Sequence, residues 1–296
     1  MKKVSIGSWA FTGENFADNP IALDEVIAKL HEMNFDGISM GGFMPHAAPS
    51  LYDTDEKREG LKKLLADNKL EVADYAADTW SVDSLKQSNE WCALFDEAAE
   101  FCSKMGWKII RVDSGTPPIV PEGHTYEDCR RQIVLNFKHI CQTAQKYGQK
   151  VVWEFEPGFM INEPKYILKT FEEVNEPNFF VLVDTCHAYM SAVVGARHIE
   201  PDVLDGGVLE LIDMLKGKIG FVHVIDSDGT LNVTQTSTHA PFGLGKVNFD
   251  EVIPAFLKAG YDEEWWAIDL CEWEDPFGAI KQCKEAVDAF NAKYCG

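Results

Sequence analysis

The sequence predicts a single-domain (β/α)₈ TIM barrel that spans residues 1–296. Short apolar segments alternate with amphipathic segments of helical period eight times, which is typical of this fold. No linker and no abrupt change of composition divides the chain. An open doubly wound sheet is the alternative, but no G-x-G-x-x-G follows the first expected strand. The pattern therefore favours the closed barrel.

The expected strands are apolar runs rich in β-branched and aromatic residues. They lie at 4–11, 36–43, 71–79, 109–115, 150–156, 179–187, 219–226 and 265–271. Helices are expected between them, for example at 21–33, 56–67 and 130–147, because apolar residues recur there every three or four positions. Residues suited to helix ends agree with this division: Asn68, Gly148 and Gly260 at stops, and Asp24 or Asn248 near starts.

The loops that follow the expected strands differ in length. Those after the second, fourth, sixth and seventh strands are long and rich in Pro, His and Gly, whereas the connections before the strands are short. In a barrel of this kind the loops after the strands build the active-site face. We therefore expect the chemistry at the carboxyl ends of the strands.

Composition narrows the possible partners and the compartment. The 48 acidic residues exceed the 27 basic ones, giving a formal net charge of −21, which disfavours nucleic acid and anionic membranes. No apolar run is long enough to span a bilayer, and the N-terminus does not resemble a signal peptide. The eight cysteines form no C-x-x-C pair and are expected to be reduced thiols, which indicates the cytoplasm.

Acidic residues and a histidine stand at the ends of four consecutive expected strands, each among apolar neighbours. They are Glu154 and Glu156 on the fifth strand, Asp184 on the sixth, His223 on the seventh and Asp269 on the eighth. Strand alternation places both glutamates on the inward face, and Trp153 and Phe155 on the face toward the helices. Because neighbouring strand ends converge at the mouth of a barrel, these groups can surround one divalent cation.

A purely structural interpretation is the alternative. A buried acid on a strand is often paired with a basic residue, and Arg111 on the fourth strand is an available partner for Glu156. A single strand histidine is more often a core residue than a ligand. Several such groups at equivalent strand ends favour the metal site, because a cation offsets carboxylates that would otherwise repel one another.

Three motifs in the second half of the chain resemble one superfamily. V-D-T-C-H (183–187), H-V-I-D (223–226) and H-A-P-F-G-L-G-K-V-N-F-D-E-V (239–252) are similar to those of the xylose isomerase-like TIM barrels. That superfamily includes sugar phosphate isomerases and epimerases of the tagatose/psicose 3-epimerase kind. The resemblance implies that Glu154, Asp184, His223 and Asp269 bind a metal and that His187 bonds a substrate oxygen.

The resemblance also implies a mechanism, with one departure. In the epimerases, the acids of strands five and eight exchange a proton with the carbon beside a metal-bound carbonyl, through an enediolate. Here the strand-eight acid is Asp269 rather than a longer Glu, which puts its reach as a base in doubt. Besides Glu154 and Asp269, Glu156 is then a candidate catalytic acid, and His124 is a further candidate for the proton transfer.

The expected cofactor is one divalent metal ion, with Mn²⁺ preferred and Mg²⁺, Co²⁺ or Zn²⁺ as alternatives. The expected ligand is a small sugar or glycoside, and a neutral one, because no glycine-rich phosphate cradle is apparent. His239, Arg111 and His124 are further expected substrate contacts. Trp9 and Phe43 are expected to stack on a sugar ring, with a core role as the alternative for Phe43.

Three other functions remain open. G-S-W-A-F (7–11), P-H-x-x-P (45–49) and W-E-F-E-P-G-F (153–159) also resemble the catalytic subunit of bacterial C-glycoside deglycosidases, metal-dependent lyases that act on 3-keto-glycosides together with a small partner subunit. Endonuclease IV shares several motifs, but it needs further metal-binding histidines from strands two and three and a surface that tolerates DNA. The third is a non-catalytic sugar-binding barrel, and a homo-oligomer is possible in any of these.

Overall fold

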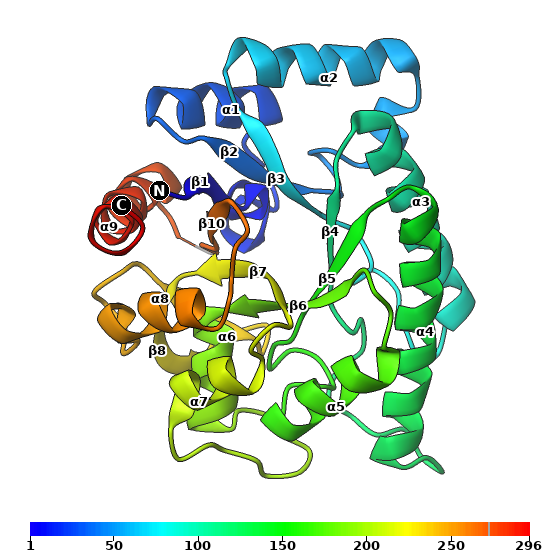
Figure 1. Cartoon of the computed structure of the whole chain (residues 1–296). Coiled ribbons are helices and arrows are strands. Elements are labelled where there is room, and N and C mark those ends of the chain that lie inside the picture. The colour runs from blue at the N-terminus through cyan, green and yellow to red at the C-terminus, as the bar shows by residue number, and fades with distance from the viewer. Residues whose placement is uncertain (272) are drawn as a thin grey trace.

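The computed structural model describes residues 1–271 and 273–296 as a nearly closed barrel of eight parallel strands surrounded by helices (Figure 1). The strands are β1 (Lys3–Ile6), β2 (Gly37–Gly41), β3 (Glu71–Ala76), β4 (Ile109–Val112), β5 (Lys150–Glu154), β6 (Phe179–Asp184), β7 (Ile219–Val224) and β10 (Trp265–Ile268). Their order around the sheet is β1-β10-β7-β6-β5-β4-β3-β2. This confirms the (β/α)₈ prediction, and each of the eight expected strands is present.

The barrel closes where β1 meets β2. A parallel bridge joins Gly7 to Ser39, and the backbone N–H of Asp36 donates to the carbonyl of Val4 at 3.0 Å. The two ends of the chain also meet. Asn291, on the last helix, pairs with the backbone of Lys2 through hydrogen bonds of 3.2 and 2.8 Å, so the termini lie side by side (Figure 1).

Helices cover the outside of the barrel. They are α1 (Leu23–Glu32), α2 (Asp55–Asp67), α3 (Ser88–Met105), α4 (Tyr126–Lys146), α5 (Pro164–Val174), α7 (Gly207–Met214), α8 (Phe249–Lys258) and α9 (Pro276–Tyr294). A short helix, α6 (Thr185–Tyr189), follows β6 directly and continues into a π-helical turn, Met190–Val194. Short 3₁₀ turns occur at Ser8–Phe11, Glu14–Phe16 and Pro49–Tyr52.

Several boundaries differ from the sequence prediction. The strands are shorter than expected at their carboxyl ends, so Glu156 lies two residues beyond β5. The helix expected at 21–33 spans Leu23–Glu32, and Asp24 lies in its first turn, near the start as expected. The long loop after β7 contains an unpredicted antiparallel hairpin of β8 (Asp226–Leu231) and β9 (Ser237–Ala240). Its short, polar strands lack the apolar runs on which the prediction relied.

Two apolar clusters stabilise the fold. The larger lies between strands and helices and includes Trp153, whose ring lies 5.3 Å from that of Phe137 on α4. The smaller, which we call the barrel floor, lies inside the barrel and consists of Ala73, Val152, Leu182, Phe221, Trp265 and Ala267. Trp153 therefore faces outward and Val152 inward, as the alternation predicts.

Among the described residues, no helix is long and apolar enough to cross a membrane. No disulfide joins any of the cysteines in the part of the chain that the structure describes, which agrees with the expected reduced thiols.

Candidate functional site

Four residues from neighbouring strands meet at the mouth of the barrel. Glu154 and Asp184 are the last residues of β5 and β6, His223 is next to last on β7, and Asp269 directly follows β10. One ligand atom from each lies within 4.8 Å of the others, and all four side chains are buried. The register Asp184–His223–Ala267 aligns three of the strands there. We call these four residues the mouth cluster.

Within the mouth cluster, one imidazole bridges two carboxylates. Nδ1 of His223 lies 3.0 Å from Oε1 of Glu154 and 3.1 Å from Oδ2 of Asp269. Burial opposes the charged imidazole, but Glu154 and Asp269 outweigh it and raise the pKa of His223 to about 10. The protein thus places positive charge where the two acids converge.

The donor set of the mouth cluster fits a divalent cation. It offers three carboxylates and one imidazole, a mixed O/N set suited to Mn²⁺, Mg²⁺, Co²⁺ or Zn²⁺. Oδ2 of Asp184 is buried and has no hydrogen-bond partner within the described chain. Burial raises the pKa of Asp184 to about 7, and the charges of Asp269 and Glu154 add to the rise that the charges of His239 and His223 oppose. A cation at this site would supply the compensation that the two histidines leave incomplete.

Arg111 and Trp9 support the acids from the side. Nε of Arg111 donates to Oε2 of Glu154, so Arg111 pairs with Glu154 and not with Glu156 as the sequence suggested. Burial alone would raise the pKa of Glu154, but Arg111 and His223 hold it at about 2. Nε1 of Trp9 donates to Oδ1 of Asp269 at 2.7 Å. Both acids are therefore held in fixed orientations as carboxylates.

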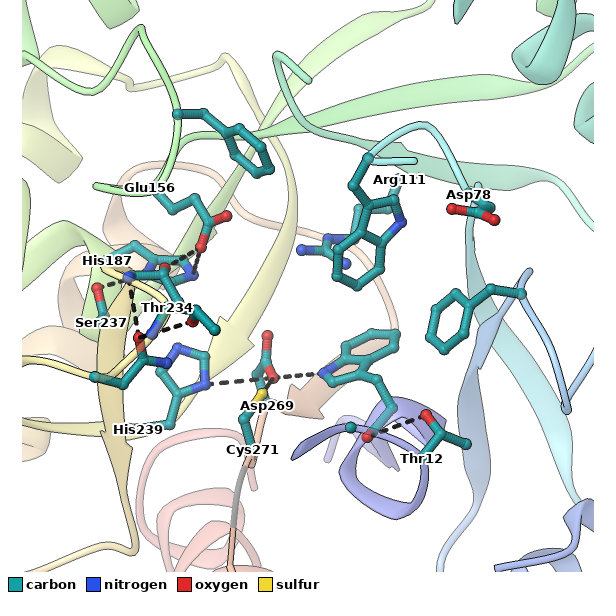
Figure 2. A pocket seen from close by; sticks show the side chains of 18 of the residues that line it. Thr12, Asp78, Arg111, Glu156, His187, Thr234, Ser237, His239, Asp269 and Cys271 are labelled. Atoms are coloured by element: carbon teal, nitrogen blue, oxygen red, sulfur yellow. Dashed lines mark hydrogen bonds and ion pairs between the residues drawn. The ribbon is translucent and has the colours of Figure 1, made fainter. Parts of the chain in front are cut away.

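Glu156 belongs to a second group beside the mouth cluster (Figure 2). Its carboxylate accepts a hydrogen bond from the hydroxyl of Thr236 and lies 3.3 Å from Nε2 of His187. Nδ1 of His187 lies 2.8 Å from Oγ of Ser237. Burial, together with the nearby charges of Glu154 and Asp113, raises the pKa of Glu156 to about 8.

His239 connects the two groups. Its ring is buried on β9, with Nδ1 3.5 Å from Oδ1 of Asp269 and Nε2 3.9 Å from Oδ1 of Asp184. The His187 and His239 ring centroids lie 4.9 Å apart. Because β9 alternates, Ser237 and His239 point to the same side, into the site.

Asp226 explains two of the sequence motifs. Its Oδ2 accepts the backbone N–H groups of Gly243 and Gly245, each at 3.0 Å, and its Oδ1 accepts that of Val247 at 3.0 Å. A Cβ on residue 245 would lie 2.3 Å from Oδ1 of Asp226, so only glycine fits. Asp226, the last residue of H-V-I-D (223–226), and the two glycines of G-L-G (243–245) therefore fix the conformation of the loop that carries His239.

A cavity of about 630 Å³ opens onto these groups (Figure 2). Aromatic and apolar side chains form part of its wall, and its polar wall includes acids, histidines and hydroxyl groups. The apolar residues are Trp9, Phe43, Met44, Trp80 and Phe159, and the polar ones include Asp78, Arg111, Glu156, His187, Ser237, His239, Asp269 and Cys271. Phe43 and Trp80 meet edge to face, with ring centroids 5.3 Å apart. Trp9 and Phe43 thus reach the cavity rather than only the core.

A model of the xylose isomerase-like TIM barrel family matches residues 27–292 of this chain. The chain belongs to that family. Its sequence is 24% identical over 260 residues to fructoselysine 3-epimerase of Escherichia coli O157:H7, which covers 82% of this chain and 83% of that protein.

Solved structures share the fold at low sequence identity. The IOLI protein with a binding zinc atom has a TM-score of 0.72 and 19% identity, and the match covers 99% of both chains. The 3-keto-D-glucoside 4-epimerase of E. coli has a TM-score of 0.70 and 17% identity, covering 98% of this chain and all of that one. At these identities the similarity shows the fold alone.

In this xylose isomerase-like barrel, the residues singled out from the sequence are brought together, with one exception. Glu154, Asp184, His223 and Asp269 form the mouth cluster, and Trp9, Arg111, Glu156, His187 and His239 surround it. His124 lies exposed on the loop after β4, with Nδ1 near the carbonyl of Glu122, and does not line the cavity.

Sequence reasoning missed several cavity residues. Thr236 and Ser237 lie three and two residues before His239, and their proximity to a predicted substrate contact was the available signal. Asp78 and Trp80 follow β3, at the same end of the barrel as the other strand ends. Cys271 lies three residues beyond β10, and its Sγ lies 3.4 Å from Oδ1 of Asp269.

Proposed function

We propose that this chain is a divalent-metal-dependent sugar isomerase or epimerase that moves a proton beside a carbonyl group. The observation that carries the proposal is the mouth cluster, a four-residue O/N donor set of which one member, Asp269, lines a cavity of about 630 Å³. Family membership and the similarity to fructoselysine 3-epimerase support the same class of reaction. The substrate is then a keto-sugar or a sugar derivative.

Glu154, Asp184, His223 and Asp269 would hold the cation. When bound, a divalent cation polarises a carbonyl group and stabilises the negative charge that follows loss of a neighbouring proton. Arg111 keeps Glu154 ionised, and Trp9 fixes one oxygen of Asp269. The identity of the ion is part of the proposal, with Mn²⁺ preferred on the chemistry of the donor set and Zn²⁺ an alternative.

Three acids line the cavity, and two of them, Asp269 and Glu156, lie in or beside the mouth cluster, whereas the third, Asp78, follows β3. Glu154 is not among the lining residues and contacts Arg111 and His223. We therefore assign the proton transfer first to Glu156 and Asp269, with Glu154 chiefly a ligand. One carboxylate removes the proton from the carbon beside the carbonyl. A carboxylic acid then returns a proton to the other face of that carbon, or to the neighbouring carbon.

His187 and His239 would bind substrate oxygens. Nδ1 of His187 bonds Ser237, and its backbone N–H donates to Oδ1 of Asp184 at 2.8 Å, so the ring is fixed in place. Burial, then the charge of His239, lowers the pKa of His187 to about 3, which keeps its imidazole neutral. Trp9 and Phe43 offer aromatic faces to the apolar side of a sugar ring.

A second candidate is the lyase reaction of C-glycoside deglycosidases on a 3-keto-glycoside. The cavity favours it in one respect, because its volume lies in the range of pockets for drug-sized ligands and its outer wall is aromatic. Proton removal beside a ketone is common to both reactions, so the mouth cluster does not separate them. This candidate would also require a small partner subunit.

The deciding experiment compares metal-depleted and Mn²⁺-reconstituted protein on a panel of free ketoses, fructosamines and 3-keto C-glucosides. The proposal expects metal-dependent interconversion of ketoses or their derivatives. Release of an aromatic aglycone from 3-keto C-glucosides alone would favour the lyase. Glu59→Gln, an exposed change on α2, is the matched control for Glu154→Gln. If no substrate turns over with any divalent ion, the proposal fails.

We place the reaction in the cytoplasm, which the thiol state of the eight cysteines supports. Size-exclusion chromatography with light scattering, on the protein alone and after copurification, measures whether it forms a homo-oligomer or recruits a small subunit.

A further inference from the structure

One polar group lies inside the barrel that the proposed reaction does not use. The barrel interior of this fold is usually filled by bulky apolar residues. Here β1, β2 and β3 instead contribute Ser5, Ser39 and Asp74. The two hydroxyl oxygens lie 3.2 Å apart, and Ser39 is the register partner of Asp74. All three side chains are buried.

The backbone directs Asp74 into this interior. The register of β2 and β3 shifts between Ile38 and Ser39, so that Ile38 pairs with Val72 but Ser39 pairs with Asp74. Ala73, the residue skipped by the shift, belongs to the barrel floor. The bulge therefore turns two consecutive residues toward the interior, one apolar and one acidic.

The carboxylate of Asp74 has no hydrogen bond of normal geometry in the described part of the chain, although the Ser39 hydroxyl approaches it. Its side chain is 1% exposed, and neither oxygen has a partner of normal geometry within the described residues. An unpaired buried carboxylate is costly, so its retention needs a reason. Burial raises the pKa of Asp74, and among the nearby charges that oppose this effect the imidazole of His223 is the strongest. The strand register places the two residues at the same level of the barrel, because Ser39 pairs with Asp74 and bonds Ser5, and Ser5 pairs with Ala267, which pairs with His223.

His223 has a complementary unpaired atom. Its Nδ1 is committed to Glu154 and Asp269, whereas its Nε2 is buried without a hydrogen-bond partner in the described chain. A metal-ligating histidine normally donates its second ring N–H to a carboxylate, a carbonyl or a water, which fixes the orientation of the ring and raises its basicity. A buried water that bridges two polar groups is a common way to make this link.

We propose that Asp74 is a positioning residue that accepts the Nε2–H of His223 through a buried water and so holds Nδ1 toward the cation site. Ser39, the register partner of Asp74, and Ser5, which lies 3.2 Å from Ser39, supply hydroxyl groups that can bond such a water. The role of Asp74 in cation binding rests on the proposed function. Its hydrogen bond to His223 does not.

The first test measures cation affinity of metal-free protein by isothermal titration with Mn²⁺. Asp74→Leu removes the acceptor while keeping a side chain of similar size, and it should weaken binding by about 10- to 100-fold, the usual effect of losing such a partner. Asp74→Asn keeps a side-chain oxygen that can accept the same hydrogen bond, so it should restore part of the affinity. Glu163→Gln alters a buried acid that bonds elsewhere in the fold and controls for general loosening. Mn²⁺ affinity of Asp74→Leu within twofold of wild type would overturn the assignment.

The second test needs no metal and separates this inference from the proposed function. In ¹⁵N-histidine-labelled protein, the Nε2–H proton of His223 should be shifted downfield and protected from solvent exchange. Asp74→Leu should abolish that signal, Asp74→Asn should keep it in part, and Ser39→Ala should speed its exchange. If wild-type protein binds no divalent cation, the proposed function fails, and this spectrum alone decides on Asp74. An unchanged His223 signal in Asp74→Leu would refute the hydrogen bond.

Discussion

Val152 and Glu154 lie two residues apart on the inward face of β5, yet one belongs to the barrel floor and the other to the mouth cluster. The same step of two residues separates Leu182 from Asp184, Phe221 from His223 and Ala267 from Asp269. Two residues of strand span about 7 Å. Four strands thus change from apolar packing to buried charge within that distance, which separates the barrel floor from the proposed site along each strand.

The two regions should respond differently to mutation. The barrel floor gains free energy from apolar burial and close packing. The mouth cluster holds three acids, one imidazole and the nearby Arg111 out of water, an arrangement that costs free energy unless each charge is compensated. Changes in the floor should therefore reduce stability, and changes in the mouth cluster should chiefly reduce activity and cation binding.

The largest expected effect is that of Glu154→Gln. Loss of this ligand charge should lower kcat by about 10³-fold, within the range for a group that acts directly on charge or protons in the reaction. Steady-state turnover and Mn²⁺ content measure it, with circular dichroism to establish folding. If a folded Glu154→Gln variant kept turnover within tenfold of wild type, the expectation that the mouth cluster carries activity and the barrel floor carries stability would be wrong.

The second-largest expected effect is that of Phe221→Ala in the barrel floor. A fully buried phenylalanine truncated to alanine should lower the free energy of unfolding by about 3–5 kcal/mol. Urea denaturation measures the loss. Turnover per folded molecule should stay within a few fold of wild type, because Phe221 does not line the cavity. A variant with normal stability and lost turnover would contradict this division.

The third-largest expected effect is that of Asp184→Asn. This variant separates the stability that a bound cation adds from the stability of the metal-free protein. Asp184 keeps one oxygen on the N–H of His187, and an amide can keep that bond, while its other oxygen has no protein partner among the described residues. The metal-free variant should therefore match wild type within about 0.5 kcal/mol. A cation at 100 times its Kd should stabilise wild type by about 2.7 kcal/mol, and the variant much less. Denaturation with and without Mn²⁺ tests both statements.

The smallest expected effect concerns an ion-pair network among the outer helices, whose contribution to stability can be compared with that of the mouth cluster. Arg130 on α4 is fully buried and bonds Glu127, which Lys169 also contacts. Hydrogen bonding to Arg130, with a further contribution from Lys169, lowers the pKa of Glu127 to about 2. Because this folded-state pKa is depressed, its contribution is present above the unfolded value of about 4.5 and is lost as pH falls toward 2.

Glu127→Gln should therefore lower the free energy of unfolding by about 1 kcal/mol at pH 7, a value discounted for the partial exposure of Glu127. The difference from wild type should shrink as pH falls below 4.5. Thermal or urea denaturation between pH 7 and 3 measures it, and a difference that grows on acidification would contradict the sign.

The fold and the mouth cluster were accessible from the sequence because both depend on strand periodicity. Charged residues within apolar runs, such as Asp184 in F-F-V-L-V-D, mark both a strand and its carboxyl end. The partner of Arg111 was not accessible, because strand β5 ends at Glu154 and strand alternation does not place the side chain of Glu156, two residues beyond it. Proximity in sequence could not distinguish the two glutamates.

The hairpin that carries His239 and the interior position of Asp74 were also missed. The hairpin is held by Asp226 and by backbone bonds of glycines, not by an apolar pattern. Asp74 enters the barrel through a register shift between β2 and β3, which strict alternation cannot predict. Both depend on long-range pairing, which local sequence patterns do not encode.

Solvent hydrogen exchange tests the central claim most directly. Metal-depleted and Mn²⁺-reconstituted protein are incubated in D₂O with the ketose or sugar derivative found active in the panel, and deuterium at the carbon beside the carbonyl is followed by NMR. The account predicts deuterium incorporation only with the cation, and its loss in Glu154→Gln but not in Glu59→Gln. Product formed without exchange, or exchange at the same rate without any divalent cation, would contradict it.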